Sequence, residues 1–206
     1  MSNHDFRPQG GVQAPLLGRL LSGIDDNQRV TIADFGVGAS SVLKVFEPYR
    51  ARLDTLDIHS QLPTWHSVET REERAALIGA HIDSFQLEPV DLVCCWSVLN
   101  YIEPSTMTLV IQALKPYMKA NAAVHALIEY SSPSMPATPP SWTLKIVNEQ
   151  LHLHAAETEA VANSPRHTPK RLEGILRGMK AQSTVLLSNG LQEYIFRPTD
   201  PPVADS

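Results

Sequence analysis

The sequence has little cysteine, no signal-like start and no long apolar run. Its two cysteines, Cys94 and Cys95, are adjacent, so they cannot link distant segments, and a fold without disulfides suits a reducing compartment. We interpret them as buried strand residues rather than a redox pair. No apolar run approaches the roughly 20 residues that span a bilayer, and the polar residues 1–5 lack a signal-peptide pattern. We therefore expect a soluble, cytoplasmic protein without membrane contact.

Concentrated positive charge is also missing. The net charge is −5, and the longest basic run is Lys170-Arg171. Proteins that follow a phosphate backbone usually cluster Lys and Arg, so we expect no nucleic-acid partner. The eight histidines show no His-x-x-x-His spacing, and His152 and His154 would share a face only in a strand. We therefore expect no metal site.

The sequence has enough apolar material for one packed domain, since 43% of its 206 residues are hydrophobic and 19% are charged. Its pattern predicts strands at 30–35, 52–58, 81–85, 90–96 and 122–130, and helices at 12–21, 41–49, 67–80, 104–114 and 168–179. Strands that alternate with helices favour a parallel sheet. Asn189-Gly190, between the β-rich runs 182–187 and 191–196, predicts an antiparallel hairpin near the end of the chain.

The most informative segment is 30–41, where an apolar run ends in Asp34 and Phe35-Gly36-Val37-Gly38 follows. A strand, an acidic tip, a glycine turn and a helix start are typical of an open α/β sheet that holds a nucleotide-like ligand. A Cβ at these glycines would block the turn and keep the backbone away from the ligand. The dinucleotide fingerprint has glycine where this chain has Ser41, and the carboxylate of Asp34 would repel a pyrophosphate. A cofactor with a free ammonium group, such as S-adenosylmethionine, would be attracted instead.

Acidic and aromatic residues follow the other expected strands. Asp57 stands at the end of the second strand, where an acid can accept two hydrogen bonds from a ribose. Asp83 and Phe85 stand at the end of the third, where a carboxylate can meet an adenine amine and an aromatic ring can cover the base. Trp96 ends the fourth strand and suits either core packing or a wall of the ligand site. All of these positions are expected at the carboxyl-terminal edge of the sheet.

The order and spacing of these motifs resemble the class I (Rossmann-like) S-adenosylmethionine-dependent methyltransferases. The resemblance rests on residues 34–38, 57, 83–85, 90–102, 113–116 and 182–196. It covers about residues 12–196 of a single domain. It implies an α/β fold with a doubly wound, mostly parallel, seven-stranded sheet that a C-terminal antiparallel hairpin closes. Two positions depart from the family pattern, because Ser40 and Tyr117 stand where the family usually has glycine.

The resemblance also implies S-adenosylmethionine as the cofactor. It assigns cofactor contacts to Asp34, Gly36, Gly38, Ser40, Asp57, Ile58, Asp83, Phe85 and Trp96. The proline-rich segment 131–165 is expected to form a substrate lid or an insertion, because loops of that length are usually functional or disordered. Residues 197–206 are expected to form a disordered tail.

No motif marks a catalytic base. The weak candidates are His59, Tyr101, Glu129 and Tyr130, each of which also suits a structural role. Methyl transfer from a sulfonium is a direct displacement, in which the protein chiefly aligns the groups and excludes water. A missing motif therefore does not exclude an enzyme.

We expect methyl transfer to a small molecule or a protein side chain. Two alternatives stay open. The first is a non-catalytic binding or partner protein with the same fold, which the imperfect glycine motif suggests. The second is a nicotinamide-dependent oxidoreductase, which would bind a dinucleotide. The sequence indicates neither the substrate nor the oligomeric state.

Overall fold

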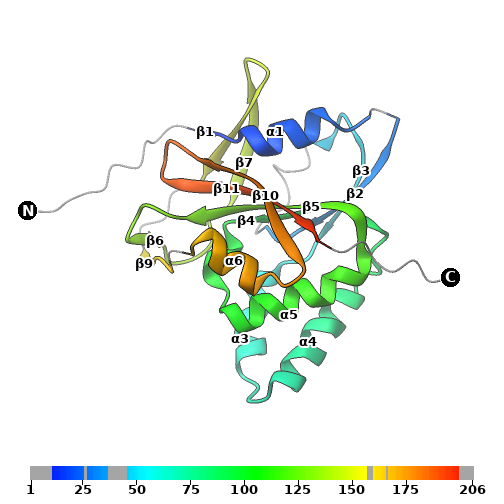
Figure 1. Ribbon diagram of the computed structural model, residues 1–206, viewed down its shortest axis with the longest axis vertical. Helices are drawn as coiled ribbons and strands as arrows, with labels where there is room; N and C mark the ends of the chain where they lie inside the picture. The colour runs from blue at the N-terminus through cyan, green and yellow to red at the C-terminus, as the bar shows by residue number, and fades with distance from the viewer. Residues whose placement is uncertain (1–10, 26, 37–45, 157–159, 166, 200–206) are drawn as a thin grey trace, which may run out of the picture.

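The computed structural model describes residues 11–25, 27–36, 46–156, 160–165 and 167–199. Within these residues, a mixed six-stranded sheet of order β10-β11-β5-β4-β2-β3 forms the centre of the molecule (Figure 1). The parallel strands are β2 (Arg29–Asp34), β3 (Arg50–Thr55), β4 (Val90–Trp96) and β5 (Met118–Glu129). An antiparallel hairpin of β10 (Met179–Leu186) and β11 (Leu191–Pro198) joins the sheet beside β5.

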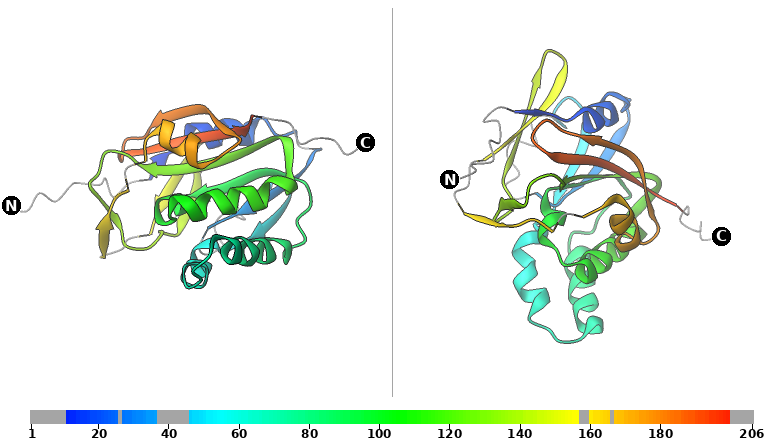
Figure 2. Two further views of the ribbon diagram at one scale, coloured as in Figure 1. Left: turned by 60° about the horizontal axis from the view of Figure 1, so that its bottom comes forward. Right: turned by 60° about the vertical axis from the view of Figure 1, so that its left-hand side comes forward.

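Helices cover one face of this sheet. They are α3 (Ile58–His66), α4 (Arg71–Asp83), α5 (Pro104–Leu114) and α6 (Pro169–Ile175). Figure 2 shows α4 and α5 on this side of the sheet and α1 (Pro15–Ser22) on the other. Because successive strand residues point to opposite faces, Cys95 packs in the core beneath the helices and Cys94 in the core on the α1 side. Both cysteines are free and fully buried, and burial raises the pKa of each thiol, which confirms the strand interpretation.

The second face carries α1 and a small antiparallel sheet. This sheet has the order β1-β8-β7, from β1 (Val12–Gln13), β8 (Gln150–Ala155) and β7 (Trp142–Val147). Two further short strands, β6 (Ser134–Pro136) and β9 (Val161–Asn163), pair with each other near the end of β5 (Figure 1). The described part of segment 131–165 is therefore largely folded into strands. Two short 3-10 helices, η1 (Val98–Tyr101) and η2 (Lys115–Tyr117), are the remaining elements in the part of the chain that the structure describes.

Several sequence predictions are confirmed. The strand at 90–96 and the helix at 104–114 have the predicted bounds, and the final hairpin forms around Asn189-Gly190. The helix predicted at 41–49 lies mostly outside the described residues, as does most of the predicted tail. Every helix in the described ranges is too short or too polar to cross a membrane.

The strand predicted at 81–85 is wrong. Thr70 caps α4 by accepting a hydrogen bond from the backbone N–H of Glu73, and the helix then continues through Asp83. Ile78 and Ile82 lie four residues apart and are both fully buried, so the helical period extends into the segment that was expected to be a strand. The described residues accordingly give six strands in the central sheet instead of the expected seven.

The strand predicted at 52–58 ends early, at Thr55. Asp57 has a left-handed backbone (φ 40°), which turns the chain, and α3 begins at Ile58. The change in direction is local, and the alternation of residues 52–56 gave no sign of it.

Candidate functional site

Asp34 is the last residue of β2, and its side chain is fully buried. Its Oδ1 accepts hydrogen bonds from the backbone N–H of Gly36 at 2.9 Å and from the indole Nε1 of Trp96 at 2.6 Å. Its Oδ2 is also buried and has no partner among the described residues. Burial raises the pKa of the Asp34 carboxyl, and the two hydrogen bonds oppose that shift. The strand end thus holds one hydrogen-bonded carboxylate oxygen and one buried oxygen without a partner among the described residues.

The residue at position 36 must be small. A Cβ on Gly36 would lie 3.0 Å from Oδ1 of Asp34 and 3.1 Å from the Trp96 indole. Glycine therefore lets the backbone reach the carboxylate, as the sequence motif predicted. Gly38 and Ser40, the next two predicted contacts, lie outside the described residues.

Trp96 ends β4, next to β2 in the sheet. Its backbone has φ 47°, which is unusual for a bulky residue, and its side chain is 1% exposed. Strained conformations of this kind occur preferentially at functional sites. Asp34, Gly36 and Trp96 therefore form one contact group at the carboxyl-terminal edge of the parallel strands.

A second group borders the same edge. The exposed Asp57 follows β3, and the backbone N–H of its neighbour Leu56 donates to the Asp34 carbonyl at 2.7 Å. The rings of His59 and Tyr101 meet edge to face with centroids 6.0 Å apart, and the Tyr101 hydroxyl donates to the Pro136 carbonyl of β6 at 3.0 Å. Burial lowers the pKa of His59, and the nearby Asp57 opposes that shift.

The predicted contact Ile58 is fully buried in the core beneath the helices. Glu129 ends β5 and is 4% exposed, whereas Tyr130 is 46% exposed. The backbone N–H of Glu129 donates to Oδ1 of Asn100, whose Nδ2 donates to the Ser97 and Leu127 carbonyls. Asn100, which sequence reasoning missed, thus attaches η1 to the end of β5.

Asp83 does not join this edge, contrary to prediction. Asp83 is the last residue of α4 and accepts a hydrogen bond of 2.5 Å from the hydroxyl of Tyr117. Tyr117 is the residue directly before β5. Met118, the first residue of β5, pairs with Val90 at the start of β4, so Asp83 lies at the amino-terminal edge of the sheet. Phe85 packs edge to face on His81 with ring centroids 5.2 Å apart, and Nε2 of His81 lies 2.7 Å from the Leu56 carbonyl beside Asp57. Asp83 departs from its predicted place because α4 continues to this residue and no strand separates α4 from β4.

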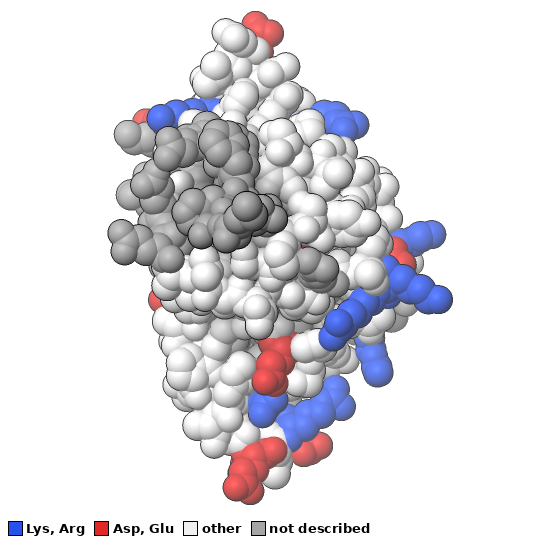
Figure 3. Space-filling model, turned by 90° about the vertical axis from the view of Figure 1, so that its left-hand side faces the viewer, with Lys and Arg blue, Asp and Glu red and all other residues white. Residues whose placement is uncertain are grey.

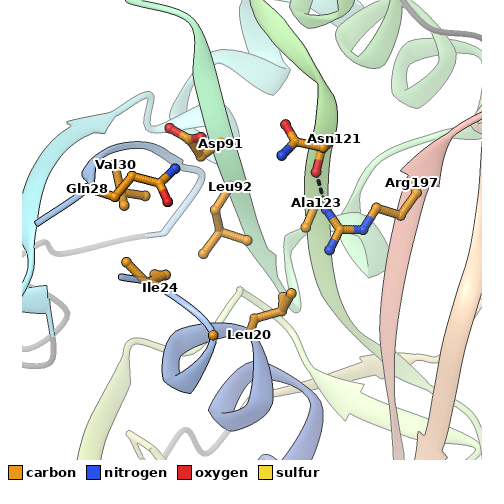
Figure 4. A pocket seen from close by; sticks show the side chains of 10 residues that line it. Leu20, Ile24, Gln28, Val30, Asp91, Leu92, Asn121, Ala123 and Arg197 are labelled. Carbon is orange, nitrogen blue, oxygen red and sulfur yellow. Dashed lines mark hydrogen bonds between the residues drawn. The ribbon is translucent and has the colours of Figure 1, made fainter. Parts of the chain in front are cut away.

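A shallow pocket of about 160 Å³ also lies at the amino-terminal edge (Figure 4). Leu20 and Ile24 line one side, and Asp91, Asn121 and Arg197 line the other. The Arg197 guanidinium donates to the Asn121 carbonyl across its rim. Since the pocket is built from the first residues of β4 and β5, it is separate from the group around Asp34.

Three further buried polar residues stand out in the structure, and two of them, His125 and Glu193, were not singled out from the sequence. His125 and Glu193, on β5 and β11, are fully buried and lie 3.1 Å apart through Nε2 and Oε1. His167, just before α6, is 2% exposed, and neither ring nitrogen has a partner among the described residues. The only available signal was a charged or ionisable residue inside an apolar strand, such as His125 within the run 122–128.

The sequence matches no protein-family model and no curated protein. The structure is similar to the pyocyanin biosynthetic protein PhzM, with 13% identity over 88% of this chain and 54% of PhzM, at a TM-score of 0.50. The chain thus spans about half the length of PhzM. The 1,6-didemethyltoxoflavin-N1-methyltransferase of Burkholderia thailandensis is 13% identical over 90% of this chain and 76% of that enzyme, at a TM-score of 0.49. The glycopeptide N-methyltransferase MtfA is 9% identical over 88% of this chain and 92% of MtfA, at a TM-score of 0.48.

The chain has the class I S-adenosylmethionine-dependent methyltransferase fold. The parallel strands followed by an antiparallel hairpin beside β5 agree with the resemblance seen in the sequence. At identities this low, the likeness concerns the methyltransferase fold alone. The function has to be argued from the residues at the carboxyl-terminal edge.

Proposed function

We propose that this protein binds S-adenosylmethionine at the carboxyl-terminal edge of β2 and β4 and transfers its methyl group to a small molecule or a protein side chain. The observation that carries the proposal is the buried carboxylate of Asp34. Trp96 and Gly36 hold its Oδ1, while Oδ2 has no partner among the described residues. A buried carboxylate oxygen without a hydrogen bond costs free energy, and a cationic ligand would remove that cost.

The residues present fit the cofactor. Its methionine part carries an ammonium group, which suits the available oxygen of Asp34. The absent side chain of Gly36 lets its backbone amide approach Asp34 and Trp96, because a Cβ there would touch both, and this keeps the carboxylate in place for the ligand. Asp57 is exposed beside the tip of β2 and can accept hydrogen bonds from ribose hydroxyls. Gly38 and Ser40 remain predicted contacts.

When bound, the cofactor supplies a methyl group that its sulfonium already activates. The chain must then align the acceptor and exclude water. His59 suits the role of proton acceptor for an acceptor group that arrives protonated. Its lowered pKa keeps the imidazole neutral at pH 7, and the Tyr101 ring fixes one side of it.

The described surface beside β6 supports an acceptor without strong charge. Residues 130–142 contain no Lys, Arg, Asp or Glu. Figure 3 views the molecule from this side and shows charged residues mainly toward its lower and right-hand parts. An uncharged border favours a neutral acceptor group, since it offers no charged side chain to pair with an ionic one.

One observation favours a second candidate, a protein of this fold that binds a partner without catalysis. No strand forms at 81–85, and Asp83 lies at the opposite edge of the sheet, so it cannot meet an adenine amine as the sequence predicted. Such a site lacks one of the cofactor contacts that the sequence predicted. A nicotinamide cofactor has no comparable support, because Asp34 would repel its pyrophosphate.

Titration calorimetry with S-adenosylmethionine, S-adenosylhomocysteine and NAD tests the proposal. We expect micromolar binding of the first two and none of NAD. Asp34→Asn should weaken that binding, whereas Asp83→Asn, the matched change at the opposite edge, should not. If none of the three ligands binds, the methyltransferase proposal is rejected and the non-catalytic partner protein is favoured.

A further inference from the structure

A buried carboxylate caps helix α1 from the far end of the chain. Glu193 of β11 accepts hydrogen bonds from the backbone N–H groups of Leu16 and Leu17, at 2.9 and 2.8 Å. The residue at the cap position, Ala14, has no side chain that could do this. A carboxylate at a helix N-terminus is also favoured by the helix dipole. Glu193 therefore seats α1 on the central sheet.

The same carboxylate holds an imidazole on the neighbouring strand. Oε1 of Glu193 lies 3.1 Å from Nε2 of His125 on β5, and neither side chain is exposed. The opposite ring nitrogen, Nδ1 of His125, is buried without a partner in the described part of the chain. Capping α1 requires Glu193 alone, and an apolar residue at position 125 would avoid the burial of that nitrogen. The helix cap therefore does not account for the histidine.

The His125 ring does have one specific neighbour. It packs edge to face on the Trp96 indole, with ring centroids 5.6 Å apart and an interplanar angle of 75°. The indole in turn donates its Nε1–H to Oδ1 of Asp34. A continuous buried path thus leads from the N-terminus of α1 through Glu193, His125 and Trp96 to Asp34.

We infer that His125 and Glu193 are positioning residues of the S-adenosylmethionine site, and that they couple the seating of α1 to cofactor binding. The inference rests on the proposed function. Glu193 fixes the rotation of the imidazole, the imidazole fixes the indole, and the indole fixes which oxygen of Asp34 stays available. Without the pair, the indole could turn and Asp34 would lose the hydrogen bond that orients its carboxylate.

Coupling acts in both directions, because linkage between two equilibria is reciprocal. A cofactor that holds Asp34 in place also holds Trp96 and His125, and with them the carboxylate that caps α1. Binding should therefore slow hydrogen exchange of the Leu16 and Leu17 amides, whose acceptor is Glu193.

The test combines calorimetry with hydrogen-exchange mass spectrometry, using S-adenosylhomocysteine as the unreactive probe. The variants are Glu193→Gln, which keeps the shape of the side chain, and His125→Phe, which keeps a ring but loses the contact with Glu193. The matched control is Leu144→Val, a change in the same core on β7, where Leu144 pairs with Leu153 of β8 and with no residue of the path. We expect both path variants to bind the probe between about fivefold and twentyfold more weakly. The control should bind it like the wild type.

In the wild type, the probe should slow exchange of the peptide that contains α1, and Glu193→Gln should abolish this protection. Wild-type affinity in a folded Glu193→Gln protein would overturn the inference, as would a wild type whose α1 exchange ignores the bound probe. A wild type that does not bind the probe would instead reject the proposed function. If His125→Phe fails to fold, Glu193→Gln and the wild-type exchange still decide the matter.

Discussion

The indole Nε1 of Trp96 lies 2.6 Å from Oδ1 of Asp34, and both side chains are almost fully buried. The hydrogen bond joins the ends of two adjacent parallel strands, β2 and β4. It leaves the second carboxylate oxygen of Asp34 without a partner among the residues that the structure describes. The fold thus keeps a buried, incompletely paired carboxylate at the edge where ligands bind in open α/β sheets. Such a group reduces stability, and its presence calls for a functional reason.

Asp34→Asn should stabilise the protein while weakening cofactor binding. Burial raises the pKa of the carboxyl, so the ionised form is disfavoured in the folded state. The folded protein therefore holds this proton more tightly than the unfolded chain does. Its free energy of unfolding falls as the pH rises from the ordinary pKa of 3.8 through the raised pKa of the folded state. The amide keeps an oxygen for Trp96 and Gly36 without the charge. We expect a gain of about 0.5–2 kcal/mol in the free energy of unfolding at pH 7.

Denaturant unfolding at pH 7 and pH 4 checks the stability effect, and calorimetry checks the binding effect. The stabilisation should shrink at the lower pH, because the wild-type carboxyl then becomes protonated. Affinity for S-adenosylmethionine should fall by about tenfold to a hundredfold, the value of a hydrogen bond to a charged group. A variant that is stabilised but binds normally would show that Oδ2 does not contact the cofactor.

Trp96→Phe should lower both stability and affinity. The substitution removes the indole donor to a buried carboxylate, which should cost about 1.5–3 kcal/mol. Trp142→Phe is the matched control, because the Trp142 indole donates to the neutral hydroxyl of Ser97 at 3.2 Å in the same core. Urea unfolding should show the larger loss for Trp96→Phe. Equal losses would mean that the charge of Asp34 contributes nothing to the bond.

Gly36→Ala should disturb the site through sterics. The new Cβ would lie 3.0 Å from Oδ1 of Asp34, so the carboxylate or the indole must shift. Overpacking of this kind costs about 1–3 kcal/mol. Gly79→Ala in α4 is the control, because its Cβ meets nothing within 4 Å and should stabilise the helix by about 0.5–1 kcal/mol. Thermal unfolding should move the two melting temperatures in opposite directions.

The sequence was sufficient to predict elements whose signals are local. β4 is a nearly continuous apolar run, broken only by Asp91, and α5 begins at Pro104 and ends at Leu114, directly before Lys115-Pro116, with a clear helical period between. The contact between Asp34 and Gly36 was predictable in the same way, because the two residues are neighbours in the chain. The hydrogen bond from Trp96 was not predicted, because it depends on β2 and β4 lying side by side in the sheet.

Other features depend on partners that are distant in sequence. The segment 81–85 is too short to show a period of its own, and the buried positions Ile78 and Ile82 show that the helix continues into it. Glu193 caps a helix 176 residues away, which no local pattern can indicate. The β7–β8 hairpin pairs with β1 and packs against α1, so the sequence of residues 141–162 alone did not decide between strand and helix.

Asp57→Ala should weaken S-adenosylmethionine binding by about 1–3 kcal/mol, because ribose hydroxyls would lose their acceptor. The side chain is exposed and makes no cap to α3, so the loss of stability should be limited to about 1 kcal/mol, because alanine adopts the left-handed backbone less readily than aspartate. Asp83→Ala removes an equivalent acid at the opposite edge and should leave the affinity unaltered. Calorimetry of both variants compares the two positions directly. Loss of binding in Asp83→Ala alone would reverse the assignment of the edge.

His167→Phe should make the protein less sensitive to acid. Burial, and secondarily Arg171, lowers the pKa of His167, so the unfolded chain binds a proton at pH values where the folded protein does not. Stability therefore rises with pH through this window, and the contribution of His167 is lost as the pH falls below the ordinary histidine value of 6.5. Phenylalanine cannot take up the proton and leaves no ring nitrogen unpartnered.

Urea unfolding at pH 7.5, 6.5 and 5.5 measures the effect. The wild type should lose stability more steeply than the variant as the pH falls, and the difference should be smallest at pH 7.5. Arg171→Gln should reduce the slope only in part, since burial is the larger cause. Parallel pH profiles for the wild type and His167→Phe would show that the imidazole becomes protonated as readily in the folded protein as in the unfolded chain.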